Sequence, residues 1–208
     1  MRLVILGPPG AGKGTQAARI AQRLRIPQLS TGEMFRAAVH ARTKLGEQAK
    51  GIMERGGLVP DNIVLRIVAG RIEASDAQPG FILDGFPRTI GQAVEFDEML
   101  AERRLKLDRV LNLRVDEHAL FNRIVTRARE MAARGDTARK DDNPEPLRHR
   151  LAAYSKEAAP LVGYYERQGL LRSVDGLQPI EIVTDQLFAV INTRISASSE
   201  DHERSHPP

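Results

Sequence analysis

Residues 2–15 read RLVILGPPGAGKGT, and this stretch decides the fold. Its apolar part, Leu3–Leu6, predicts a short buried strand, and apolar residues recur at helical spacing within Gly12–Leu24. The loop between them carries several glycines and a lysine, Lys13. In such a loop the backbone N–H groups converge on phosphate oxygens, and the lysine adds a positive charge. The stretch therefore predicts a phosphate-binding loop that joins a strand to a helix.

The residue after the lysine departs from the usual phosphate-loop pattern. A serine or threonine normally follows the lysine and touches magnesium, but here Gly14 follows it and Thr15 comes one residue later. We therefore expect Thr15 to contact phosphate first. The alternative interpretation, a glycine-rich turn without a ligand, is disfavoured because the strand, the glycines, the lysine and the helix all occur in the required order.

The rest of the chain alternates short apolar runs with longer amphipathic segments, the pattern of a parallel sheet connected by helices. It predicts a doubly wound α/β fold. The expected strands are Leu3–Leu6, Gln28–Leu29, Phe81–Leu83, Arg109–Leu113 and Leu170–Val174. Helices are expected after a capping box at Ser30, over Thr43–Arg55, from Pro60 onward, from about Asp116, and over Pro146–Gln168. Residues 30–59 thus form a helical insertion, and the polar stretch Arg127–Asp142 forms a second one.

Composition limits the class of protein. The chain has 208 residues, 41% of them hydrophobic and 28% charged, which describes one soluble domain or two small ones, with enough residues for a real core. The formal net charge of +4 suits an anionic small molecule or nucleic acid. Six Phe, three Tyr and no Trp supply few rings for base stacking, so single-stranded nucleic acid is a weak candidate.

The absence of cysteine excludes disulfides and thiolate zinc sites, and it fits a reducing compartment, which makes the cytoplasm the expected location. No apolar run approaches the roughly 18 residues of a membrane span, so no membrane partner is expected. The tail 196–208 is polar and acidic and is expected to be disordered.

Two further features suggest a catalytic site. Asp84 ends a predicted strand and is followed by Gly85-Phe86-Pro87-Arg88, so an acid and an arginine are expected at the carboxyl edge of the sheet, where ligands bind in such folds. Arg123, Arg127, Arg139 and Arg150 surround the second insertion. Such a run is usually a solvated face, but phosphoryl transfer is catalysed mainly by positioned cations, which favours a functional interpretation.

These residues resemble the adenylate kinase family of nucleoside monophosphate kinases over residues 1–195. The matching segments are residues 7–16 (GPPGAGKGTQ), 29–36 (LSTGEMFR), 84–88 (DGFPR) with Gln92, 123–127 (RIVTR), 139–142 (RKDD), 148–151 (RHRL) and 159–165 (APLVGYY). The resemblance implies a P-loop NTPase core with a five-stranded parallel sheet, a monophosphate-binding insertion at 30–59 and a short lid at about 126–138.

The resemblance also implies the site residues. ATP phosphates would be held by Gly10, Ala11, Gly12, Lys13, Gly14 and Thr15. AMP would be held by Thr31, Arg36, Gly57, Leu58, Val59, Gly85, Phe86, Pro87, Arg88 and Gln92. Arg127 would contact ATP with Arg123 beside it, Arg139 and Arg150 would reach the phosphates between the nucleotides, and the backbone of Gln178 would contact adenine. Asp84 would lie near the magnesium.

The implied reaction is reversible transfer from ATP to AMP, which gives two ADP and balances the adenine nucleotides. Mg²⁺ would enter with ATP. The lid lacks the four zinc-binding positions of some relatives, so no structural zinc is expected. The protein is expected to act as a monomer.

Three alternatives remain. A uridylate/cytidylate kinase of the same family would share the phosphate loop and the arginines, but Thr31 and Gln92 stand at purine-reading positions, and an amide can pair with an amino group and a ring nitrogen. A P-loop switch that transfers no phosphate would need no second nucleotide site. A nucleic-acid binder would lose RNA affinity steeply with salt, and the sequence offers no element to read bases.

Overall fold

The computed structural model describes residues 1–55, 57–116, 120 and 144–193. Its centre is one five-stranded sheet in the order β2-β3-β1-β4-β5, and every neighbouring pair is parallel. The strands are β1 (Arg2–Leu6), β2 (Gln28–Ser30), β3 (Phe81–Asp84), β4 (Arg109–Arg114) and β5 (Leu171–Asp175). The predicted strands and the parallel sheet are therefore confirmed.

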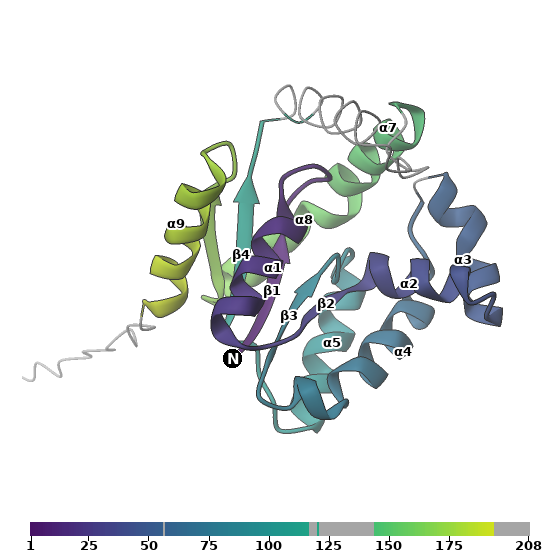
Figure 1. Cartoon of the computed structure of the whole chain (residues 1–208), viewed down its shortest axis with the longest axis horizontal. Helices are drawn as coiled ribbons and strands as arrows, with labels where there is room; N and C mark the ends of the chain where they lie inside the picture. Colours follow the sequence, from purple (N-terminus) through teal and green to yellow (C-terminus); the bar gives the residue numbers. More distant parts are fainter. Residues whose placement is uncertain (56, 117–119, 121–143, 194–208) are drawn as a thin grey trace, which may run out of the picture.

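Helices connect the strands in chain order. They are α1 (Lys13–Leu24), α2 (Thr31–His40), α3 (Lys44–Glu54), α4 (Asp61–Ile72), α5 (Ile90–Glu102), α7 (Pro144–Ala153), α8 (Pro160–Arg167) and α9 (Ile180–Asn192), with a short 3₁₀ turn η1 (Ser75–Ala77). In Figure 1, α2 and α3 project from the β2 side of the sheet, and α9 lies at the β5 side. The insertion at 30–59 therefore emerges from one edge of the sheet.

Alternating residues of β1 face two separate halves of the core. Val4 and Leu6 belong to a cluster with buried residues of α4, α5 and α8, whereas Leu3 and Ile5 pack with buried residues of α1 and α9. Successive side chains of a strand point to opposite faces, so both faces of the sheet need helices. This is the doubly wound arrangement that the sequence predicts.

Side-chain caps fix the starts of the helices in the insertion. The Ser30 hydroxyl accepts from the Glu33 N–H at 3.4 Å, and the Thr43 hydroxyl accepts from the Gly46 N–H at 3.1 Å. Each cap satisfies a donor that has no partner within its helix. The starts of α2 and α3 are therefore set locally, as the sequence predicts.

The chain is helical over nearly all of the predicted segment Pro146–Gln168, but not as one uninterrupted α-helix. The chain forms α7, then a π-helical turn η3 (Tyr154–Ala158), then α8. Pro160 has no N–H and its ring would clash with the carbonyl four residues earlier, and a wider turn before it relieves this conflict. The Ala159 N–H accordingly donates to the Tyr154 carbonyl, five residues back, at 2.9 Å.

Among the helices that the structure describes, none is long and apolar enough to cross a membrane.

Candidate active site

The phosphate loop follows β1 at the carboxyl edge of the sheet. Gly7 has φ +142° and lies so close to β4 that a Cβ placed on it would stand 2.9 Å from the Leu113 carbonyl oxygen. Only glycine fits this approach without a shift of the backbone. β1 also lies between β3 and β4, where the strand order reverses, which is the usual place for a ligand in such a sheet.

The loop presents backbone N–H groups and a lysine to the same place. Gly12 precedes α1 with φ +91° and provides no side-chain cap, and the first turn of α1 contains no acid. The Lys13 ammonium donates to the carbonyl oxygens of Gly7 at 2.7 Å and Pro8 at 2.9 Å, so it lies against the loop itself. The positive end of a helix together with an ammonium favours an anion such as phosphate.

Asp84 ends β3, and its Cα is paired with Ile5 of β1. The carboxylate accepts from the Gln28 amide at 3.4 Å, and a Cβ placed on Gly14 would lie 3.5 Å from Asp84 Oδ2. A hard carboxylate oxygen therefore lies beside the first turn of α1. Mg²⁺ is usually bound by one or two carboxylates together with substrate phosphates, so Asp84 fits an ion that arrives with a nucleotide.

The loop after Asp84 positions an arginine. Gly85 has φ +81°, and a Cβ placed on it would lie 3.0 Å from Thr31 Oγ1 and 3.1 Å from Arg88 Nη2. The Arg88 Nε donates to the Gly85 carbonyl at 2.8 Å, and the Thr31 hydroxyl donates to the same oxygen at 2.9 Å. Glycine at this point thus lets the arginine and the threonine approach one backbone carbonyl from two sides.

A first pocket brings together three of the expected cations, Lys13, Arg88 and Arg150. Arg150 comes from the last turn of α7, so segments far apart in the chain contribute charge to one space. The complete lining is Ile5, Leu6, Gly7, Pro9, Lys13, Leu58, Gly85, Pro87, Arg88, Arg150, Ala153, Tyr154 and Ala158.

A second pocket lies between α2, the segment 57–59 and the start of α5. Its lining is Thr31, Gly32, Phe35, Met53, Gly57, Leu58, Val59, Val64, Gly85, Arg88 and Gln92. Leu58, Gly85 and Arg88 line both pockets. Arg88 is thus the cation shared by the two linings.

Gln92 lies in the second pocket and is only 1% exposed. Its Oε1 accepts from the Arg88 backbone N–H at 2.7 Å, and its Nε2 donates to Asp61 Oδ1 at 2.6 Å. One N–H and one lone pair of the amide remain for other partners.

The side chains of two other residues expected to bind AMP do not line the second pocket. The Phe86 ring is fully buried in the core against Phe96, with ring centroids 5.2 Å apart, so only its backbone is available to a ligand. The Arg36 guanidinium lies beside Gly32, where a Cβ would stand 3.3 Å from Nη1. Arg36 is therefore next to the second pocket without being part of the lining given above.

Gln178 lies in the loop between β5 and α9, outside both of these linings. Asp175 holds this loop, because its carboxylate accepts from the Leu177 N–H at 2.9 Å and from the Gln178 amide at 3.0 Å. Arg123, Arg127, Arg139, the lid at 126–138 and the tail 196–208 fall outside the described residues.

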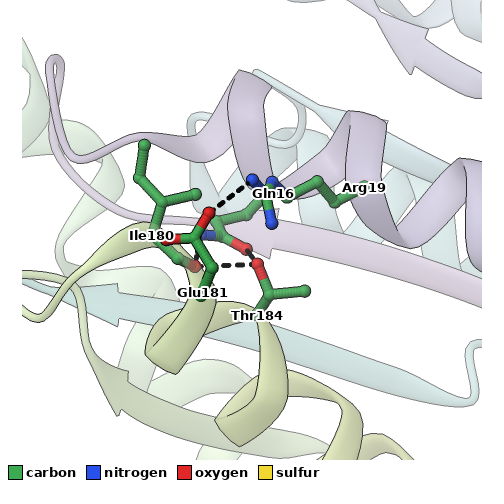
Figure 2. A network of polar contacts seen from close by, with 5 residues as sticks. All are labelled: Gln16, Arg19, Ile180, Glu181 and Thr184. Atoms are coloured by element: carbon green, nitrogen blue, oxygen red, sulfur yellow. Dashed lines mark hydrogen bonds and ion pairs between the residues drawn. The ribbon is translucent and has the colours of Figure 1, made fainter.

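A buried polar network joins the phosphate-loop helix to α9, as Figure 2 shows. The Gln16 amide donates to the Ile180 carbonyl at 3.0 Å, and the Thr184 hydroxyl donates to Gln16 Oε1 at 2.8 Å. At the rim, Arg19 forms an exposed ion pair with Glu181 at 2.9 Å. The start of α1 is thereby tied to the start of α9, the helix that follows Gln178.

Sequence reasoning missed several residues of the site. The Asp61 carboxylate binds both Thr89 and Gln92, but the sequence marks Asp61 only as a helix start. Tyr154 lines the first pocket, where burial raises its pKa, and apolar side chains of α2, α3 and α4 line the second. No sequence signal separates such lining residues from ordinary core residues.

Within residues 1–55, 57–116, 120 and 144–193, no group of three or more His, Cys, Asp or Glu residues could hold a metal ion. The candidate site is thus built from cations and backbone N–H groups, with Asp84 as the acid at its edge.

The comparisons with known proteins agree with this geometry. The family model described as "Adenylate kinase" matches residues 5–170. A protein named adenylate kinase from Methylorubrum extorquens (strain PA1) is 58% identical over 200 residues, covering 96% of this chain and 100% of the relative. Its namesake from Azorhizobium caulinodans is 53% identical over 193 residues, covering 93% of this chain and 100% of the relative. The chain therefore belongs to the adenylate kinase family of enzymes.

Proposed function

We propose that the chain transfers the γ-phosphoryl group of ATP reversibly to AMP, giving two molecules of ADP. The observation that carries the proposal is the pair of adjacent pockets that share Arg88. A nucleotide switch needs one nucleotide site, whereas transfer between two nucleotides needs two sites that meet where the phosphates react. Arg88 lies at that meeting point, and its planar guanidinium can bind oxygens of both phosphates.

The transfer is direct. A phosphate oxygen of AMP attacks the γ-phosphorus of ATP while the bond from that phosphorus to the bridging oxygen breaks, and ADP leaves. The chain has no cysteine, and positioning with charge neutralisation is sufficient for this chemistry. Lys13 and the N–H groups of the loop hold the donor phosphates, and Arg88 with Arg150 neutralises charge between the nucleotides.

Magnesium enters with ATP, and Asp84 and Thr15 are the residues that would face it. When bound, the ion neutralises phosphate charge and orients the donor. Arg123, Arg127 and Arg139 are proposed as further cations for the phosphates, and the backbone of Gln178 as a contact for the donor adenine. The reaction restores the balance among adenine nucleotides, and we infer that a single chain carries it out.

AMP is the proposed acceptor. Thr31 and Gln92 supply polar groups in the second pocket, whereas Phe35, Met53 and Val64 supply apolar surface that suits a purine ring. A uridylate/cytidylate kinase is the second candidate, since it would use the same cations.

A coupled assay with ATP and each of AMP, CMP, UMP and GMP tests the proposal, with and without Mg²⁺. We expect ADP formation with AMP, a much slower rate with the other acceptors, and loss of the reaction when EDTA removes Mg²⁺. A preference for CMP or UMP would instead establish the second candidate. ATP hydrolysis that does not respond to any monophosphate would establish a switch.

The variant Lys13→Ala tests the role of the phosphate-loop lysine in the proposed reaction. We expect kcat to fall by more than about tenfold, which is a loss of more than about 1.4 kcal/mol of transition-state stabilisation, with an unchanged far-UV circular dichroism spectrum. Lys156→Ala is the control, because this lysine is exposed and forms an ion pair with its neighbour Glu157 at 3.5 Å. Equal activity of the two variants would remove Lys13 from the proposed mechanism.

A further inference from the structure

We propose that Asp61 is a positioning residue of the monophosphate site, which fixes the orientation of the Gln92 amide and thereby the base that the site accepts. The inference rests on the proposed function, because it assumes that Gln92 reads the acceptor base. It adds a residue outside the matching segments quoted above, in a position that links two helices.

Asp61 is the first residue of α4 and directly follows the segment 57–60 beside the second pocket. Its Oδ2 accepts from the Thr89 hydroxyl at 2.9 Å, and its Oδ1 accepts from Gln92 Nε2 at 2.6 Å. Thr89 caps α5, since its hydroxyl oxygen accepts from the Gln92 N–H at 3.0 Å. One carboxylate therefore holds both the cap of α5 and the side chain that enters the pocket.

These contacts allow only one orientation of the amide. A carboxylate can only accept a hydrogen bond and a backbone N–H can only donate one, so Nε2 must face Asp61 and Oε1 must face the Arg88 N–H. A rotation of the amide by half a turn would oppose two acceptors at one end and two donors at the other. Gln92 is 1% exposed, so water does not compensate for such a mismatch.

A fixed amide orientation distinguishes bases by their donor and acceptor pattern. Adenine offers an amino donor beside a ring-nitrogen acceptor, whereas hypoxanthine, which has the same ring size, offers a carbonyl acceptor beside a ring N–H donor. An amide held with its donor end and its acceptor end in fixed places fits one of these patterns and opposes the other. AMP and IMP therefore probe the orientation of Gln92 without any change in the size of the base.

A purely electrostatic role makes a different prediction for the same residue. A negative charge at the first residue of α4 also stabilises the helix by facing its positive end. This role needs the charge, whereas orienting Gln92 needs only an acceptor at Oδ1. Asp61→Asn separates the two, because asparagine is neutral but can still accept from Gln92 with its oxygen and donate to Thr89 with its nitrogen.

The experiment compares Asp61→Ala with Asp61→Asn in the full chain. We expect Asp61→Ala to raise the KM for AMP about tenfold or more and to reduce the preference for AMP over IMP by a similar factor, with a much smaller change in kcat. Asp61→Asn should keep both values within about twofold of the wild type. Asp76→Ala is the control, because Asp76 of η1 pairs at the surface with Arg71 of α4, at 2.6 Å.

A double-mutant cycle with Gln92→Ala tests whether Asp61 acts through Gln92. In the Gln92→Ala background, Asp61→Ala should have almost no further effect on the KM for AMP or on the choice between AMP and IMP. Full additivity of the two substitutions would overturn the proposal. An Asp61→Asn variant that behaves like Asp61→Ala would also overturn it, in favour of a role of the charge.

A measurement without turnover keeps this inference separate from the proposed function. The side-chain amide resonance of Gln92, identified by its absence in Gln92→Ala, should exchange slowly with solvent in the wild type and in Asp61→Asn, and quickly in Asp61→Ala. Wild-type protein without ADP formation would refute the proposed function alone. Equal exchange rates in all three proteins would refute the role of Asp61.

Discussion

Arg88 shows how a single side chain connects the two pockets. Its Nε binds the Gly85 carbonyl, which directs the guanidinium along the boundary of both linings. Arg88→Lys keeps the charge but loses the planar guanidinium, which can bind two phosphate oxygens at once. We therefore expect kcat to fall by a larger factor than the affinity for AMP. Steady-state kinetics at varied AMP, with AMP binding measured by calorimetry, provides both quantities.

Arg172→Lys is the control for this prediction, because Arg172 also binds main-chain carbonyls, those of Gly169 and Leu171, but on β5. This variant should match the wild type. An Arg88→Lys enzyme with unchanged kcat and a raised KM would place Arg88 in ground-state binding of AMP only.

At the residue scale, the sequence predicts side chains whose position follows from the local chain. Lys13 is set by a loop of a few residues, and Arg88 follows a strand end by four residues, so the spacing alone places them near the sheet edge. Asp61 binds Gln92 across 31 residues of chain, and Tyr154 lines the same pocket as Lys13 only because the fold brings their segments together. Such contacts depend on the tertiary structure and leave no local pattern.

At the element scale, the network between α1 and α9 carries a stability prediction. Gln16 and Thr184 are 3% and 7% exposed, so the Gln16 amide depends on protein partners. Thr184→Val keeps the shape but removes the only donor shown for Gln16 Oε1 in the described part of the chain. We expect a loss of about 1–3 kcal/mol of unfolding free energy, the usual result of leaving a buried acceptor unpaired.

Denaturant unfolding followed by circular dichroism measures this loss. Thr193→Val is the matched control, since the Thr193 hydroxyl is exposed and donates to the Ala189 carbonyl in the last turn of α9. It should change the midpoint little. If Thr184→Val unfolds at the wild-type midpoint, the network does not stabilise the packing of α1 against α9.

The elements also show where sequence reasoning succeeds and fails. Every strand end is predicted to within one residue, because each apolar run is bounded by turn residues or polar segments. The start of α2 follows from the Ser30 cap, a local interaction. The sequence does not reveal the break between α7 and α8, because a proline at a helix start and a proline after a π turn have the same sequence pattern, and only the packing of η3 decides between them.

At the scale of the whole molecule, the strand order explains why both pockets form at one edge. β1 lies between β3 and β4, so the phosphate loop, Asp84 and the end of β4 meet at the carboxyl ends of neighbouring strands. The segment 30–59 leaves the sheet from β2 and supplies most of the lining of the second pocket. The described cations therefore come from the sheet edge and from α7, and most of the second pocket's lining comes from residues 30–59.

The three tyrosines report on the whole fold at high pH. Partial burial and the hydrogen bond to Asp97, at 2.7 Å, raise the pKa of Tyr164 from its ordinary value near 10 to about 12. Burial likewise raises the pKa of Tyr154 and of Tyr165, which is fully buried. Between pH 10 and 12 the folded protein therefore binds more protons than the unfolded chain, so its stability decreases as the pH rises through this window.

An alkaline titration tests this prediction, and the absence of tryptophan leaves the phenolate absorbance easy to measure. We expect no phenolate step as the pH passes 10 in the folded protein, and a step at higher pH together with the loss of helical circular dichroism. In strong denaturant the same tyrosines should titrate near pH 10. Tyr164→Phe should lose stability less steeply across the window, because it lacks one of the shifted groups. A full phenolate step near pH 10 with unchanged circular dichroism would contradict the prediction. It would mean that the tyrosines are solvated in the folded protein and that α8 packs more loosely against α5 than in this structure.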